Sequence, residues 1–299
     1  MLEGLYLNIL LIGGTGFVGK NLTKSLINME HHVFIVTRTP NLYENSSQIT
    51  YIGYEHPINK LPPIYAVINL AGESLFGYWT KKKKDTILTS RVNATVKVIQ
   101  MMKEMKKKPA VFINGSAIGY YGTSTDLIFT EKTRKSGDDF LAHVVTKWEN
   151  TASAAENLGI RTIYARFGVI LGQEGALPFM TLPVKLFLGG KIGLGEQWIS
   201  WIHVKDVVNL LIYCLTNEKI GGPLNITAPH PMRNKDFIKT LTQIYKRPFW
   251  LPTPTIFLRA ALGEMSELIT KGQFVLPKKA QTNGFQFSYP HLKEALENI

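Results

Sequence analysis

Residues 13–19 read GGTGFVG, and this glycine-rich stretch decides the fold class of the chain. It follows the apolar run of residues 7–12, which predicts a buried strand, and it opens a helical pattern over residues 17–29. A G-x-x-G-x-x-G spacing between a strand and a helix is typical of a dinucleotide-binding turn. The first glycine permits the tight turn, the second lets a pyrophosphate approach the backbone, and the third lets the helix pack closely on the strand.

Strand-length apolar runs alternate with longer helical patterns through the first half of the chain. The predicted strands are residues 33–37, 66–70, 111–114 and 161–166, and the predicted helices lie within residues 79–107 and 139–158. Apolar strands separated by helices predict a parallel sheet that is covered on both faces. With right-handed crossovers, the pattern predicts an α/β fold, a Rossmann-like doubly wound parallel sheet.

The composition of the chain changes after Gly168, where glycine and proline become frequent. We therefore predict a dinucleotide-binding domain over residues 1–168 and a smaller C-terminal substrate lobe over residues 169–299. Elements near residues 200–228 are expected to return to the sheet, and residues 247–299 are expected to form a distinct C-terminal segment.

Composition excludes several classes of protein. The 299 residues are 45% hydrophobic and 19% charged, as in a folded globular protein. The single cysteine, Cys214, permits neither an intrachain disulfide nor a zinc-finger spacing, and no metal site is predicted. No apolar run reaches the roughly 18 residues that span a bilayer, and the first apolar run has no basic residues before it. A cytoplasmic location is expected.

The formal net charge of +12 permits anionic partners. The lysines of residues 81–84 and 103–108 lie at opposite ends of one predicted helix, where a solvated helix face explains them. No nucleic-acid-binding motif is present, so the expected partner is a small-molecule substrate rather than nucleic acid or a membrane. A membrane-surface or RNA role for the lysine runs remains the alternative.

The second predicted strand ends with a feature that favours NADP(H) over NAD(H). NAD sites usually place an acid about 20 residues beyond the glycine motif, and Arg38 occupies that place here. A guanidinium matches a 2′-phosphate through charge-assisted hydrogen bonds, and Thr37 adds a hydroxyl. Small residues after the strand over residues 66–70 either let a cofactor ribose approach the backbone or form a tight turn.

Several further motifs resemble those of a known superfamily. Residues 114–122 (NGSAIGYYG) and 201–207 (WIHVKDV) are similar to the extended short-chain dehydrogenases/reductases, also called the NAD(P)-dependent epimerase/dehydratase family. Residues 69–73 (NLAGE), 197–203 (QWISWIH) and 284–290 (GFQFSYP) resemble its atypical subgroup known only as "epimerase family protein", which has a C-terminal domain of unknown function. The resemblance covers essentially the whole chain.

The resemblance implies an NADP(H)-dependent oxidoreductase or epimerase of unidentified substrate, and a homodimer is conceivable because superfamily members often dimerise. It also implies a Tyr-x-x-x-Lys pair, whose tyrosine transfers a proton at a pKa lowered by the lysine. Here Lys147 has His143 four residues before it, and aligning on Glu149 instead places Leu141 and Val145 at the two positions. Neither register restores the pair.

Two arrangements could replace the missing pair, and catalysis by residues that the sequence does not identify is a further alternative. His143 could carry the proton with Lys147 tuning it, because the two share a helix face. Tyr120 or Tyr121 could supply a phenol beside Ser116. The chain could also be a non-catalytic NADP(H)-binding sensor or regulatory module.

The candidate site residues follow from these motifs. The catalytic candidates are Ser116, Tyr121 and Lys147. The predicted cofactor-binding residues are Gly13, Thr15, Gly16, Phe17, Gly19, Thr37, Arg38, Leu70, Ala71, Gly72 and Arg91. Arg91 is either a phosphate or ribose contact or part of a surface ion pair. Asp206 is expected to cap the helix near residues 205–216, and His203 to be structural.

Overall fold

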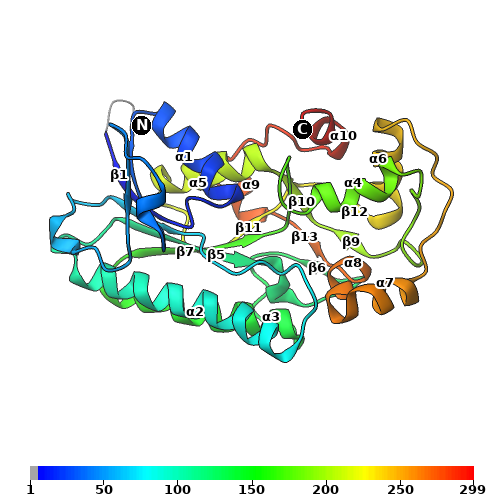
Figure 1. Cartoon of the computed structure of the whole chain (residues 1–299), viewed down its shortest axis with the longest axis horizontal. Coiled ribbons are helices and arrows are strands. Elements are labelled where there is room, and N and C mark those ends of the chain that lie inside the picture. The colour runs from blue at the N-terminus through cyan, green and yellow to red at the C-terminus, as the bar shows by residue number, and fades with distance from the viewer. Residues whose placement is uncertain (1–5) are drawn as a thin grey trace.

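A seven-stranded parallel sheet forms the centre of the molecule (Figure 1), as the computed structural model of residues 6–299 shows. The strands are β1 Asn8–Ile12, β2 His32–Val36, β3 Ile49–Ile52, β4 Ala66–Asn69, β5 Val111–Ala117, β7 Arg161–Phe167 and β11 Gly222–Ile226. They lie in the order β11-β7-β5-β4-β1-β2-β3. The chain order reverses between β1 and β4, and ligands of such sheets bind in the crevice at this point, beyond the carboxyl ends of the strands.

Helices cover both faces of the sheet. Figure 1 shows α1 (Phe17–Asn28) and α5 (Val204–Thr216) above it, and α2 (Lys81–Glu104) and α3 (Phe140–Ala152) below it. Alternate residues of β1 point to opposite faces of the sheet. Ile9 and Leu11 pack in the core with α1, and Leu10 and Ile12 pack in the core with α2. A strand buried on both faces must be apolar throughout, and this explains why the predicted strands are apolar runs rather than alternating apolar and polar residues. The Rossmann-like α/β prediction is confirmed.

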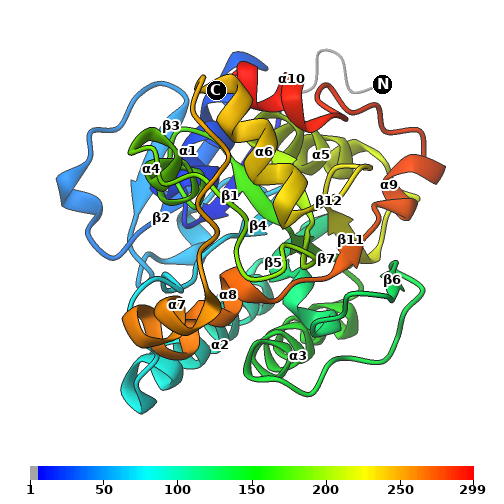
Figure 2. The same ribbon diagram turned by 90° about the vertical axis from the view of Figure 1, so that its right-hand side faces the viewer.

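The C-terminal lobe is built from short elements (Figure 2). Its small sheets pair β8 (Val169–Leu171) with β10 (Trp201–His203), β9 (Trp198–Ile199) with β12 (Met232–Arg233), and β6 (Ile128–Phe129) with β13 (Phe274–Val275). Its helices are α4 Leu177–Lys185, α6 Asn234–Ile244, α7 Thr255–Leu262, α8 Glu267–Thr270, α9 Lys278–Thr282 and α10 Leu292–Glu297. Of these elements, β8, α4, β10, α6 and α10 contribute to a third core, in which Trp201 and Phe237 are fully buried.

The lobe and the sheet share elements. β11 joins the sheet beside β7, and α5 packs against α1, although both follow the first half of the chain in sequence. Short 3-10 helices connect the larger elements. They are Pro40–Leu42, Ile58–Lys60, Ile118–Tyr121, Ser153–Leu158 and Gly263–Ser266.

The structure contains elements that the sequence patterns did not predict. β3 is a half-buried edge strand of only four residues, too short for a periodicity signal. α4 contains Pro178 in its first turn and Pro183 in its interior, so its sequence resembles a loop. The α-helix expected over residues 139–158 ends at Ala152 and continues as a 3-10 helix.

The expectation that Asp206 caps α5 is wrong. His203 is the N-cap, and its Nδ1 accepts a hydrogen bond from the Lys205 backbone N–H at 3.1 Å. The Asp206 carboxylate is fully buried and accepts the backbone N–H groups of Ser288 and Tyr289 at 2.8 and 2.9 Å. It therefore fastens the C-terminal segment to α5.

Within residues 6–299, every helix is either too short or too polar to span a lipid bilayer.

Replacing Asp206 with alanine should lower the free energy of unfolding by roughly 2–4 kcal/mol, because two backbone N–H groups lose the buried carboxylate that accepts from them. Urea denaturation of the purified protein measures the change. The exposed Asp85→Asn is the matched control and should leave the midpoint in place. An Asp206→Ala protein as stable as this control would contradict the assigned role.

Candidate functional site

A cavity of about 590 Å³ lies where the strand order reverses. Its walls come from the glycine turn, the ends of β4 and β5, one face of α3, and the segment around α8. The predicted cofactor residues in its wall are Gly13, Gly16, Phe17, Gly19, Leu70, Gly72 and Arg91. Thr15, Thr37, Arg38 and Ala71 lie outside the wall. Of the catalytic candidates, Ser116 lines the cavity.

The glycine turn leaves no room for a side chain at Gly13 or Gly19. Gly13 has a positive φ of +81°, and a Cβ there would lie 2.8 Å from the Leu70 carbonyl carbon. A Cβ on Gly19 would lie 2.2 Å from the Gly13 oxygen. Gly16 is the N-cap of α1 and has no side chain to occupy the first N–H groups of the helix. The positive end of α1 is thereby left open toward the cavity, which suits a phosphate.

Arg38 lies at the same edge of the sheet as the glycine turn. Ile12 is paired with Val36, so β1 and β2 both leave the sheet at this level. Arg38 is exposed, and none of the ion pairs within residues 6–299 includes it. The pKa of Glu73 is lowered, first by a hydrogen bond from Lys83 and further by the charges of Arg38 and Arg91. A positive field therefore surrounds this end of the cavity.

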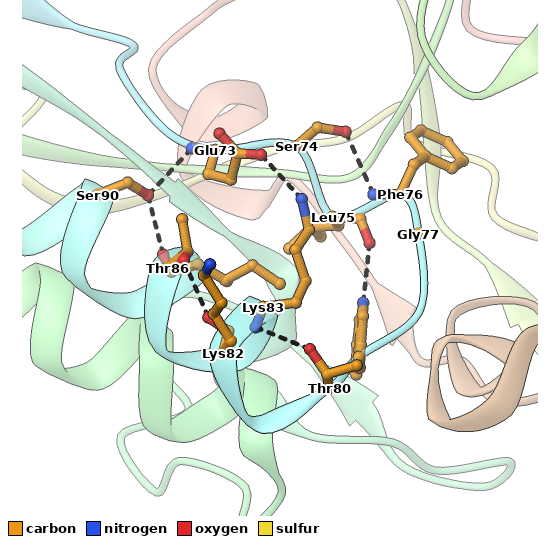
Figure 3. Close-up of polar contacts among 12 residues, drawn as sticks. Glu73, Ser74, Leu75, Phe76, Gly77, Thr80, Lys82, Lys83, Thr86 and Ser90 are labelled. Carbon is orange, nitrogen blue, oxygen red and sulfur yellow. Dashed lines mark hydrogen bonds and ion pairs between the residues drawn. The ribbon is translucent and has the colours of Figure 1, made fainter.

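The loop that follows β4 is held against the start of α2 (Figure 3). Ser90 Oγ accepts the Glu73 N–H at 3.1 Å, and Glu73 accepts from Lys83 Nζ at 2.8 Å. The Trp79 indole N–H donates to the Leu75 carbonyl at 2.8 Å. These contacts fold the loop back on itself, and Leu75 lines the cavity.

Arg91 supplies a cation in the cavity wall. Its guanidinium donates to the Ile87 carbonyl at 3.0 Å, and its Cζ lies 5.3 Å from the centre of the Trp148 ring. No carboxylate of the described chain forms an ion pair with it. Burial lowers its pKa to about 10, which still leaves it charged at neutral pH. Of the two alternatives for Arg91, the surface ion pair is absent among residues 6–299, and the position in the cavity wall is compatible with a cofactor contact.

The orientation of α3 decides between the two possible registers of the missing pair. Leu141, Val145 and Trp148 face the cavity, whereas His143 and Lys147 are exposed and lie outside its wall. The two cavity-lining positions that are four residues apart on α3 are therefore occupied by aliphatic residues, Leu141 and Val145. Lys147 has no contact with the cavity, and a proton relay through His143 would have to work from the solvent side of the helix.

Ser116 belongs to a buried polar network beneath the cavity. Its hydroxyl donates to Glu149 Oε1 at 2.6 Å, and Arg166 Nε and Nη2 donate to the two Glu149 oxygens, both at 2.8 Å. Burial opposes the charge on Arg166, but the hydrogen bonds and charge of Glu149 outweigh it and raise the pKa of Arg166. Because the only hydroxyl proton of Ser116 is bonded to a carboxylate, its oxygen is available to the cavity as an acceptor.

The two tyrosines beside Ser116 have other partners. The Tyr121 hydroxyl donates to Asn225 Oδ1 at 2.7 Å, its ring stacks on Phe129, and burial raises the pKa of the phenol above its ordinary value. The Tyr120 hydroxyl donates to the Arg134 carbonyl at 2.6 Å. Neither ring lines the cavity, and a raised pKa suits Tyr121 poorly to proton transfer near neutral pH.

The far wall of the cavity was not found from the sequence. Glu267, Leu268, Lys271 and Gln273 line it from the C-terminal segment. The Gln273 amide donates to the Ile118 carbonyl at 3.0 Å, and Lys271 pairs with Glu267 at 2.9 Å. No sequence signal could indicate this wall, because the contact joins parts of the chain about 150 residues apart.

Replacing Glu149 with glutamine should cost roughly 3–5 kcal/mol of unfolding free energy, because it leaves the Arg166 charge buried without a counter-ion. Ser116→Ala, which removes one neutral donor, should cost about 1 kcal/mol. Urea unfolding of both variants measures the difference. Glu55→Gln, at an exposed glutamate, is the control, and a Glu149→Gln protein no less stable than Glu55→Gln would contradict this account.

Comparisons with known proteins agree with this geometry. Residues 9–227 match the model of the NAD-dependent epimerase/dehydratase family, and residues 253–299 match a domain of unknown function, DUF1731. The chain is 48% identical over 297 residues to the epimerase family protein YfhF of Bacillus subtilis, with 98% of each chain covered.

Solved structures extend the comparison. The human epimerase family protein SDR39U1, solved with NADPH, is 30% identical with a TM-score of 0.87, over 98% of this chain and all of that one. A nucleoside-diphosphate sugar epimerase of Corynebacterium glutamicum is 30% identical with a TM-score of 0.79, over 98% of this chain and 58% of that one. The UDP-glucuronic acid 4-epimerase of Bacillus cereus is 18% identical with a TM-score of 0.75, over 97% of both chains, and shows a shared fold.

Proposed function

This chain belongs to the NAD-dependent epimerase/dehydratase family, and from that premise we propose that it is an NADP(H)-binding oxidoreductase or epimerase without the usual Tyr-x-x-x-Lys pair. The observation that carries the proposal is the glycine turn, where a Cβ on Gly13 or Gly19 would strike the backbone. Such a cradle fits a pyrophosphate against the open N-terminus of α1.

The preference for NADP(H) rests on Arg38. This exposed guanidinium stands beside the glycine turn, at the strand end where NAD sites place an acid. With Thr37 it would hold a 2′-phosphate by charge-assisted hydrogen bonds. The structure of the human relative with NADPH agrees with this preference.

The remaining predicted residues have places that suit a dinucleotide. Thr15, Gly16 and Phe17 would meet the pyrophosphate at the start of α1. Residues 70–72 would border a ribose, and Arg91 would contact a phosphate or ribose. A bound nicotinamide would supply or accept a hydride.

Two features of the inner cavity bear on the reaction. Leu141 and Val145 present an aliphatic wall that excludes water from this face. Ser116, held by Glu149, would accept a hydrogen bond from a hydroxyl of the substrate. The substrate would be an unidentified small molecule with a hydroxyl or carbonyl group.

Arg38→Glu should weaken NADPH binding about ten- to a hundredfold, because it removes a phosphate contact of roughly 1.5–3 kcal/mol and adds a repelling charge. Paired fluorescence titrations with NADPH and NADH measure the effect. The exposed Lys24→Glu makes the same charge change elsewhere on the first domain. A wild-type protein that binds NADH as tightly as NADPH would contradict the preference.

Catalysis should be detectable as oxidation of NADPH in the presence of a panel of aldehydes and ketones. Ser116→Ala should lower kcat by about ten- to a hundredfold in the reverse assay, reduction of NADP+ by the corresponding alcohols, because the acceptor that orients the substrate hydroxyl is lost. NADPH affinity measured on the same variant separates catalysis from cofactor binding.

The aliphatic α3 face also supports a second function, a non-catalytic NADP(H) sensor. Under that hypothesis NADPH binds but no carbonyl compound is reduced, and NADPH changes the affinity of the protein for a cellular partner. Pull-downs that are identical with and without NADPH would remove the basis for the sensor.

A further inference from the structure

Exposed apolar side chains gather at the outer end of the C-terminal lobe. They lie on three segments: residues 76–78, α4 with the turn to residue 194, and residues 249–257. The most exposed are Tyr78, Phe179, Leu194, Trp250, Ile256 and Phe257, each more than 60% exposed. We call this surface the apolar face. Figures 1 and 2 show α4 and α7 at the same end of the molecule.

Contacts between the segments make the apolar face continuous. The rings of Phe76 and Phe179 lie 4.7 Å apart. The Tyr78 hydroxyl donates to the Ala261 carbonyl of α7, and the Trp250 indole N–H donates to the Phe187 carbonyl at 2.9 Å. The loop after β4, the turn after α4 and the chain leading into α7 therefore form one surface.

The two helices of the apolar face carry few polar side chains, and each has one charged residue, Lys185 on α4 and Arg259 on α7. α4 buries Leu177 and Val184, yet its outer side presents Phe179 and Leu182. α7 reads TIFLRAAL, and none of its residues is buried. Helices that expose this many large apolar side chains are normally covered, so this face is suited to meeting a partner.

The segments that form the apolar face carry charges of one sign. No Asp or Glu occurs between Glu174 and Glu196 or between Asp236 and Glu264. Exposed cations lie within these segments, at Lys185, Lys191, Lys246 and Arg259. At the edge of the face, Lys84 is paired with Glu264.

An anionic lipid surface fits this combination better than a second copy of the chain. A symmetric dimer through the face would bring these cations against their own copies without acids to pair them. A bilayer surface accepts Trp, Phe and Leu side chains at its interface and cations among anionic headgroups. We propose that the apolar face docks on the surface of an anionic lipid bilayer.

This assignment differs from the expectation of no membrane partner, which considered only spanning segments and the lysine runs of α2. The protein lies on the bilayer and does not cross it. The cavity adjoins the docking surface, since Leu75 lines the cavity and the next residue, Phe76, belongs to the apolar face.

Sedimentation with lipid vesicles tests the proposal on the full chain in the presence of NADPH. Vesicles of phosphatidylcholine with about one third phosphatidylglycerol should bind the protein, phosphatidylcholine alone should bind it less, and added salt should weaken binding. The double variant Leu182→Ser, Phe257→Ser should bind anionic vesicles about tenfold or more weakly, because both side chains lose their apolar insertion. Lys191→Gln with Arg259→Gln should also weaken binding.

The matched control is Leu42→Ser with Leu127→Ser, two exposed leucines outside the apolar face, which should bind like the wild type. Circular dichroism and thermal melting of each variant show that it is folded, independently of any ligand. Wild-type protein that stays in the supernatant with anionic vesicles would overturn the proposal. A dimer in light scattering that the Leu182→Ser, Phe257→Ser protein no longer forms would assign the face to a second copy instead, and would also overturn it.

Discussion

The close approach of α1 to the turn after β1 is the constraint on which the rest of the site depends. The Gly13 oxygen occupies the space that a Cβ of residue 19 would need, and Gly13 itself lies against the Leu70 backbone at the end of β4. This packing requires glycine at both positions. It directs the first N–H groups of α1 into the cavity and brings the ends of β1 and β4 together. The other walls of the cavity come from the end of β5, one face of α3 and the segment around α8.

The inner half of the cavity departs from the usual chemistry of the family. The helix face that would carry a tyrosine and a lysine carries Leu141 and Val145. The polar group that remains there, Ser116, is bonded to a buried ion pair, in which Arg166 holds both oxygens of Glu149. Such a pair is costly to bury and costly to break. It fixes the direction in which Ser116 presents its oxygen beside the aliphatic residues of α3.

The C-terminal segment has two roles that depend on contacts far along the chain. Asp206 fastens residues 288 and 289 to α5, and Gln273 joins the segment to the end of β5. Through these contacts the segment closes the cavity on the side opposite the glycine turn. On its outer side the same lobe exposes apolar helices with cations around them. The C-terminal lobe therefore both closes the cavity and carries the surface that would meet a membrane.

The sequence by itself determined the fold class and the position of the glycine turn. Strands such as β1 are buried on both faces and must be apolar throughout. The glycine turn is formed by residues close together in the chain, so its spacing can be recognised directly in the sequence. Only the tertiary structure decided the register of α3, because the single lysine suggested an alignment that the packing of Leu141 and Val145 excludes. It also decided the role of Asp206, whose partners lie about 80 residues away. Contacts of this range leave no periodic pattern, since each depends on how distant segments meet after folding.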